Sequence, residues 1–261
     1  MNNNAINSSE LPRVLLENGY LLNTREFDFG GLIPFENLYS KFDIILNKVF
    51  RKNILLVGHP GTGKTSAVLH YYVSRHFDNL YIIECNKLIS NTAYRGQFEQ
   101  KITDILEYVN KFNLCVFFDE MHALIGLGKV DGGMCITDIL KPYLITGSVV
   151  FIGATTLKES KIFMQDEAFK RRFSLINMPI CTDDFLLSIA NKVMKHLKIL
   201  EDKILNTADL LYIIAMLSKN LTHLFFPDKL VDFLDYYYAS LKIQTTDIKL
   251  IIEEYIHDNA F

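Results

Sequence analysis

Five short hydrophobic runs alternate with segments of helical periodicity in the first 180 residues. Runs of this length, bounded by glycine or polar residues, are typical of buried strands. The runs cover residues 53–58, 80–85, 114–119, 149–155 and, more weakly, 173–180. Helical spacing occurs at Leu38, Phe42, Ile45, Leu46 and Val49, and again at Phe98, Ile102, Ile105, Leu106 and Val109. This alternation predicts an α/β fold with a five-stranded parallel sheet and helices on both faces.

The pattern changes after Ile180, where strand-like runs stop. Apolar residues then recur at helical spacing in three stripes, over residues 185–197, 210–217 and 230–241. We therefore predict a disordered lead-in over residues 1–13, a large α/β domain over 14–180 and a small, mainly helical domain over 181–261.

Composition narrows the class of protein. The 261 residues are 49% hydrophobic and 22% charged, as expected for a globular protein with a real core. The formal net charge of -3 gives no overall attraction to nucleic acid. The N-terminal sequence MNNNAINSSELP has neither a signal-peptide core nor a membrane span, and the four scattered cysteines lack metal-ligand spacing. We therefore expect a cytoplasmic protein with buried, reduced thiols.

The segment GHPGTGKT, residues 58–65, matches the phosphate-loop pattern G-x-x-x-x-G-K-[ST] between a predicted strand and a predicted helix. Its glycines let backbone N–H groups point at phosphate oxygens, and the helix adds the positive end of its dipole. We expect Lys64 to reach the β- and γ-phosphates of ATP and Thr65 to bind Mg²⁺. The predicted nucleotide-binding residues of the loop are Gly58, His59, Pro60, Gly61, Thr62, Gly63, Lys64 and Thr65.

Two adjacent carboxylates end the third hydrophobic run, LCVFFDE. Asp119 is placed to hold the Mg²⁺ shell, and Glu120 to activate a water for attack on the γ-phosphate. The alternative is surface charge, which the phosphate loop upstream makes the weaker interpretation. The sequence therefore predicts an ATP-hydrolysing site.

Two further features fit such a site. The run FIGATT ends in two threonines, and a hydroxyl there would lie beside the γ-phosphate if this strand neighbours the one bearing Asp119. Adjacent arginines, Arg171 and Arg172, precede the last strand. Adjacent arginines are usually solvated charge, but an ATPase can use one as an arginine finger.

These segments resemble the Clp-type AAA+ ATPases, the protein unfoldases and disaggregases of the ClpA/ClpB kind, and specifically their first ATPase ring. The resemblance runs from about Val14 to Lys242. Its landmarks appear in order as NILLVGHPGTGKT, TAYRGQFEQK, LCVFFDEMHALIGLG, ILKP, FIGATTLKES, KRRF and FPDKLVDFLD.

The resemblance implies roles for individual residues. Thr155 corresponds to the sensor-1 residue, with Thr156 the second choice, and Arg171 and Arg172 correspond to fingers that complete a neighbouring subunit's site. The family therefore implies a homo-oligomeric ring, usually a hexamer. The apolar pair Leu32 and Ile33 would flank the adenine, the helical segment after Cys181 would form a lid, and residues 227–229 would begin the lid helix that faces the nucleotide.

The segment TAYRG resembles the family's substrate-gripping pore loop, formed here by Tyr94, Arg95 and Gly96. An aromatic ring can hold many side chains without demanding a sequence, and glycine would give the loop its freedom. The alternative is that Tyr94 packs on its own subunit. A second channel loop is expected over residues 126–135.

Some positions depart from the family. Pro34 and Phe35 replace a glycine–arginine pair beside the adenine pocket, Lys170 stands where the family has glutamate, and Tyr236 also replaces glutamate. The family members are much longer, with an N-terminal adaptor domain, a second ring and often a coiled-coil insert. The resemblance therefore supports an ATPase motor domain, and not the additional domains of the longer family members.

We expect an ATP-hydrolysing ring motor that remodels, unfolds or translocates a polypeptide, with Mg²⁺ as cofactor. A second AAA+ protein or an adaptor protein is a further candidate partner. One alternative is a loader ATPase acting on a partner protein or on DNA, which the net charge disfavours. Another is a nucleotide-switched assembly protein that does not thread its partner, which the pair Asp119–Glu120 disfavours. Neither a membrane nor a nucleic acid is an expected partner.

Overall fold

The computed structural model describes residues 11–25, 34–90, 95–124, 136–199, 203–243 and 247–260. The chain divides into two compact units. The first contains the described residues up to Asn177 except His59–Gly63, and the second contains His59–Gly63 and the residues from Met178 onward. Each unit is described by itself.

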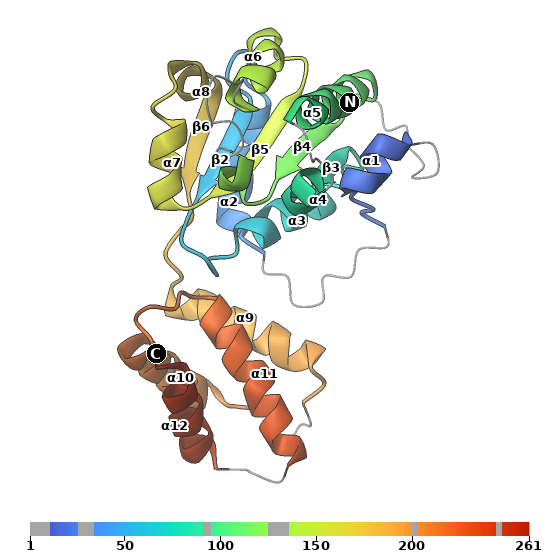
Figure 1. Ribbon diagram of the computed structural model, residues 1–261. Helices are drawn as coiled ribbons and strands as arrows, with labels where there is room; N and C mark the ends of the chain where they lie inside the picture. Colours follow the sequence, from blue (N-terminus) through green and yellow to red (C-terminus); the bar gives the residue numbers. More distant parts are fainter. Residues whose placement is uncertain are drawn as a thin grey trace. The chain divides into compact units, whose positions relative to one another are not determined.

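The first unit is built on a six-stranded sheet in the order β1-β3-β4-β5-β2-β6 (Figure 1). The strands are β1 (Gly19–Leu21), β2 (Asn53–Val57), β3 (Leu80–Ile83), β4 (Cys115–Phe118), β5 (Val150–Thr155) and β6 (Phe173–Asn177). Strands β2 to β6 pair in parallel, so the five predicted strands and their direction are confirmed.

The sixth strand was not predicted, because β1 is only three residues long and lies outside the five hydrophobic runs. It pairs antiparallel with β3, with Gly19 opposite Ile83. A Cβ atom on Gly19 would lie 2.1 Å from the carbonyl oxygen of Ile82. The strands therefore approach closely because residue 19 has no side chain.

The helices of the first unit surround this sheet. They are α1 (Arg13–Asn18), α2 (Glu36–Leu46), α3 (Lys64–Ser74), α4 (Cys85–Ser90), α5 (Arg95–Lys111), α6 (Ile136–Thr146), α7 (Leu157–Phe163), α8 (Glu167–Arg172) and the short 3₁₀ helix η2 (Met121–Leu124). Every residue of β2, β3 and β4 is buried, as expected when both faces of a sheet are covered. The predicted apolar stripe of α5 is confirmed, since Phe98, Ile102, Ile105, Leu106 and Val109 all lie in the core.

Three boundaries differ from the sequence predictions. Helix α2 ends at Leu46, and Val49 is 76% exposed beyond it. Leu11 is buried and α1 begins at Arg13, inside the segment predicted to be disordered. Gly96 was predicted to lie in a loop but belongs to the first turn of α5, because helical hydrogen bonding begins at Arg95.

The second unit is helical. It consists of α9 (Asp183–His196), α10 (Thr207–Asn220), α11 (Asp228–Lys242) and α12 (Ile248–Asn259). The three predicted stripes form α9, α10 and α11, and α12 adds the buried residues Ile251, Ile252 and Tyr255. Of the three consecutive tyrosines at positions 236–238, Tyr237 is buried, and its hydroxyl donates a hydrogen bond to the carbonyl oxygen of Lys203 at 3.0 Å. No helix in the described part of the chain is long and apolar enough to span a membrane.

Lys229 is a buried cation inside this unit, with 5% of its surface exposed. Its Nζ donates to the carbonyl oxygens of Leu217 at 3.2 Å and Leu221 at 3.0 Å, at the C-terminal end of α10. The ammonium also lies 4.3 Å from the centre of the Phe226 ring. Burial lowers the pKa of Lys229. The side chain therefore ties the start of α11 to the end of α10, where the helix dipole favours a positive charge.

Replacing Lys229 with methionine is expected to destabilise the protein by about 1 to 2 kcal/mol, because it removes charge-assisted hydrogen bonds to two carbonyl groups. Methionine also avoids the cost of burying a charged group, and this gain offsets part of the loss. Lys242→Met is the matched control, since Lys242 lies exposed on the same helix. Urea unfolding should show a lower midpoint for Lys229→Met and little change for the control. Equal midpoints for the two variants would contradict this role of Lys229.

Candidate nucleotide site

The phosphate loop connects β2 to α3. Gly61 and Gly63 have φ angles of 73° and 81°, which glycine adopts without strain. Within the loop, the backbone N–H and the hydroxyl of Thr62 donate to the carbonyl oxygen of His59, at 3.3 and 2.7 Å. The loop begins beside β5, where the backbone N–H of Gly58 donates to the carbonyl oxygen of Thr155 at 3.2 Å.

Helix α3 begins with the two residues predicted to contact phosphate and metal. Lys64 Nζ donates to the carbonyl oxygen of Gly58 at 3.0 Å. Burial lowers the pKa of Lys64, and the negative charges of Asp119, Glu120 and Glu159 oppose this shift. The Thr65 hydroxyl donates to Asp119 Oδ2 at 2.7 Å. A hydroxyl and a carboxylate in contact form an oxygen donor set suited to Mg²⁺.

The two carboxylates Asp119 and Glu120 follow the end of β4. Asp119 Oδ1 accepts a hydrogen bond from the Glu120 backbone N–H at 3.1 Å, and the Asp119 carbonyl accepts from the Cys85 thiol at 3.3 Å. Glu120 has a φ of 54°, an uncommon conformation for a residue with a side chain. Such strain costs on the order of 1 to 3 kcal/mol and clusters at functional sites. The carbonyl of Glu120 also accepts from Ala123 N–H at 2.8 Å, at the start of η2.

Thr155 lies at the end of β5, between β4 and the strand that carries the phosphate loop. Its side chain is buried, and it is paired in register with Val57. The Thr155 hydroxyl donates to Glu159 Oε2 at 3.3 Å. Thr156 is the N-cap of α7 and forms a capping box with Glu159. The structure therefore brings Gly58 and Thr65, on either side of the phosphate loop, to the same edge of the sheet as Asp119 and Thr155.

Glu159 is a further residue of this cluster that the sequence motifs did not predict. The pattern T-x-x-E across residues 156–159 is a capping-box signal that could have shown its position. His122, in η2, places its Nδ1 3.1 Å from Glu159 Oε2, an ion pair when the imidazole is protonated. Burial tends to raise the pKa of Glu159, but hydrogen bonds from Thr156, the nearby His122 and the Thr155 hydroxyl together lower it.

The two arginines lie at the other end of the sheet from this cluster. Arg171 and Arg172 end α8, directly before β6, and Phe173 is paired in register with Asn53 at the start of β2. Five residues of β2 separate that point from the phosphate loop, about 16 Å along an extended strand. The Arg171 side chain is 79% exposed, with Nε 3.7 Å from Glu167 Oε2. Within the first unit, the arginines therefore lie at the end of β2 opposite the end that leads into the phosphate loop.

The backbone that carries the arginines is anchored to the start of β2. Asn53 is buried, and its Nδ2 donates to the carbonyl oxygen of Arg172 at 3.2 Å. The Asn53 Oδ1 accepts from the backbone N–H of Phe151 at 2.9 Å. Arg51 also donates to the carbonyl oxygen of Lys170. Asn53 thus fixes the end of α8 against β2 and β5.

The remaining predicted residues fall mostly outside the described part of the chain. Leu32, Ile33 and Tyr94 are not among the described residues, and neither is the predicted second channel loop at 126–135. Arg95 begins α5, although its side chain is not described. Gly96 is exposed there, and a Cβ atom at this position would contact nothing within 4 Å. The conformational freedom of glycine is thus not needed at position 96.

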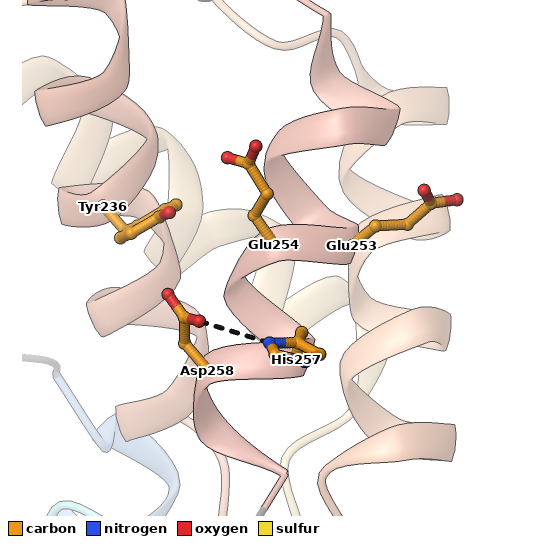
Figure 2. A pocket seen from close by; sticks show the side chains of 5 residues that line it. All are labelled: Tyr236, Glu253, Glu254, His257 and Asp258. Atoms are coloured by element: carbon orange, nitrogen blue, oxygen red, sulfur yellow. Dashed lines mark hydrogen bonds and ion pairs between the residues drawn. The ribbon is translucent and has the colours of Figure 1, made fainter.

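A separate, open pocket lies in the second unit between α11 and α12. Figure 2 shows its lining of Tyr236 from α11 and four polar residues from α12: Glu253, Glu254, His257 and Asp258. His257 Nδ1 lies 3.5 Å from Asp258 Oδ1, and both side chains are largely exposed. Burial, followed by the charges of Glu254 and Asp258, raises the pKa of Tyr236. Exposed acidic side chains of this kind are typical of a solvated helix face.

The parallel sheet, the glycine loop before α3 and the contact between Thr65 and Asp119 define a nucleotide-binding P-loop NTPase. A family model described as "ATPase family associated with various cellular activities (AAA)" matches residues 54–178. The chaperone protein ClpB of Helicobacter hepaticus is 34% identical over 211 residues, covering 77% of this chain and 25% of that protein. ClpB of Bacteroides thetaiotaomicron is 31% identical over 228 residues, covering 80% and 26%.

Solved structures agree with this assignment. The Hsp104–ADP complex of S. cerevisiae has a TM-score of 0.77 at 25% identity, covering 92% of this chain and 44% of that one. A closed-state reconstruction of Hsp104 with ATPyS and FITC casein has a TM-score of 0.75 at 25% identity, covering 94% and 46%. The chain thus spans about a quarter of the length of these ClpB relatives. It belongs to the Clp-type AAA+ ATPases.

Proposed function

We propose that this chain hydrolyses ATP with Mg²⁺ and uses the energy to remodel, unfold or translocate a polypeptide. The observation that carries the ATPase part is the contact between Thr65 and Asp119, with Glu120 next to it in a strained conformation. Bound Mg²⁺ would neutralise charge on the phosphates. Thr65 and Asp119 would hold the metal, and Lys64 would bind the β- and γ-phosphates.

In this proposal Glu120 accepts a proton from the attacking water, and Thr155 contacts the γ-phosphate from the neighbouring strand. Arg171 and Arg172 complete the nucleotide site of an adjacent subunit in a ring. The ring would be a hexamer, as is usual in the family. The distance between these arginines and their own phosphate loop along β2 supports action on another chain. Residues 181–261 would act as the lid domain, Leu32 and Ile33 would flank the adenine, and the cytoplasm would be the site of action.

The polypeptide part rests on Tyr94 and on the ClpB relatives. Tyr94 directly precedes the first turn of α5, a helix with a continuous buried face against the core. A helix held in this way can carry a displacement from the sheet to the residue at its N-terminal end. Tyr94 would grip the substrate by aromatic contact, with Arg95 beside it.

Replacing Tyr94 with alanine is expected to leave basal ATP turnover within about twofold of the wild type while removing its stimulation by unfolded casein, because the ring contacts substrate and not nucleotide. Turnover is measured with and without casein, and substrate unfolding is followed in parallel. Tyr212→Ala, which truncates a 40% exposed tyrosine of α10, serves as the control. Full stimulation of Tyr94→Ala by casein would contradict polypeptide gripping. It would favour a nucleotide-switched assembly protein.

A further inference from the structure

We propose that Glu159 is a positioning residue that links the sensor threonine Thr155 to His122, and through η2 to Glu120. This inference rests on the proposed ATPase function. It assigns to one carboxylate the task of setting where the Thr155 hydroxyl points when a γ-phosphate is present. It also gives His122 a role within the site.

A single oxygen of Glu159, Oε2, gathers four groups. It accepts from the Thr156 hydroxyl at 2.6 Å and the Thr156 backbone N–H at 3.1 Å. It also accepts from the Thr155 hydroxyl at 3.3 Å and lies 3.1 Å from His122 Nδ1. The four groups come from the end of β5, the first turn of α7 and η2, so this oxygen joins three elements.

Helix capping explains one of these four contacts. A capping box consists of the bond from the Thr156 backbone N–H to the Glu159 side chain and the bond from the Glu159 backbone N–H to the Thr156 side chain, and α7 has both. The contacts with Thr155 and His122 are not part of a capping box. The second unit offers a comparison, since Asn206 and Asp209 form the same box at the start of α10. Glu159 is therefore placed to do more than begin a helix.

The element that carries His122 is held firmly against β5. Met121 is buried, and a Cβ atom at Gly153 would lie 2.5 Å from its sulfur. The absence of a side chain at Gly153 thus lets η2 pack directly on the strand that ends in Thr155. Because η2 also begins with the bond from Ala123 N–H to the Glu120 carbonyl, a shift of His122 is transmitted to the backbone of Glu120.

The chemistry of a hydroxyl makes this arrangement sensitive to the nucleotide. Thr155 has one hydroxyl hydrogen, so it can donate to Glu159 or to a phosphate oxygen, but not fully to both. When the hydroxyl turns to a γ-phosphate, Glu159 loses one of its partners and keeps Thr156 and His122. The negative charge of Glu159 also acts on Lys64, the other predicted phosphate ligand.

The test compares Glu159→Gln with Asp209→Asn, which makes the matching change in the capping box of α10. We expect the turnover number of Glu159→Gln to fall on the order of tenfold to a hundredfold, as for a misplaced reacting group. Its affinity for ADP should stay within about twofold, while its preference for ATPγS over ADP changes by about threefold or more, because Thr155 acts on the γ-phosphate alone. Asp209→Asn should change neither the turnover number nor the nucleotide preference. It should lower the melting temperature by about as much as Glu159→Gln does.

A second variant tests the link to His122. His122→Gln should reduce turnover in the wild-type background. It should reduce turnover little further in the Glu159→Gln background, because both changes break the same contact between His122 and Glu159. Wild-type turnover and nucleotide preference in Glu159→Gln, or fully additive losses, would overturn the inference. If the wild type hydrolyses no ATP, the proposed function fails, and the ATPγS-to-ADP ratio still decides the role of Glu159.

Discussion

Replacing Glu120 with glutamine is expected to abolish ATP turnover and to leave ATP binding intact. Glutamine keeps the size of the side chain but cannot accept the proton of the attacking water, a loss of about 100-fold to 10,000-fold. The contact between Thr65 and Asp119 does not involve the Glu120 side chain, so the phosphate and metal ligands stay in place. Phosphate release and binding of a fluorescent ATP analogue measure the two properties separately.

The matched control for this variant is Glu107→Gln, on the exposed side of α5. It carries the same chemical change and should hydrolyse ATP at the wild-type rate. Turnover by Glu120→Gln at the control's rate would remove Glu120 from the reaction. Loss of ATP binding in Glu120→Gln would instead indicate that the strained backbone at position 120 fails to form with glutamine.

The second large effect is expected from Arg171. Arg171→Ala should lower turnover by about 1,000-fold or more, as is typical when an arginine finger is lost in phosphoryl transfer. Because Arg171 lies at the start of β2, opposite the end that leads into the phosphate loop, the loss should be repaired by another chain. Arg172→Ala, made in parallel, shows which of the two arginines carries the charge to the neighbour.

Mixing two inactive variants tests that repair. Arg171→Ala retains its own Glu120, and Glu120→Gln retains its own Arg171. In randomly mixed rings about a quarter of the sites combine an intact Glu120 with an intact finger from the next chain. We therefore expect the mixture to regain a clear fraction of wild-type turnover, whereas each variant alone stays inactive. A mixture as inactive as its components would show that the arginine does not act across a subunit boundary.

The sequence predicted the parts of the fold that depend on long hydrophobic patterns. The five parallel strands and the stripes of α5, α9, α10 and α11 follow directly from burial on one or two faces. Strand β1 escaped prediction because its pairing depends on the close approach at Gly19, a tertiary effect that three residues cannot signal. Helix α12 was missed although its buried residues Ile251, Ile252 and Tyr255 follow helical spacing.

The site was predicted as far as it follows local motifs. The loop at residues 58–65 and the pair after β4 are contiguous patterns with a fixed chemical meaning. Glu159 was missed because its role comes from contacts with His122 and Thr155, which are brought together only when β4 and β5 become neighbours. Gly96 was misplaced because helix α5 already begins at Arg95, inside the segment predicted to be a loop.

Strand β2 is shared by the two halves of the proposed chemistry. One end runs into the phosphate loop, and the other holds the backbone of Arg172 through Asn53. Because β2 is hydrogen-bonded to both β5 and β6, the backbone that leads into the phosphate loop and the backbone of the arginines are fixed to the same strand, and a shift at one end is expected to displace the other. In a ring, this shared strand would link each subunit's nucleotide site to the arginine that completes the neighbouring site. The nucleotide state of one subunit would then affect the site of the next.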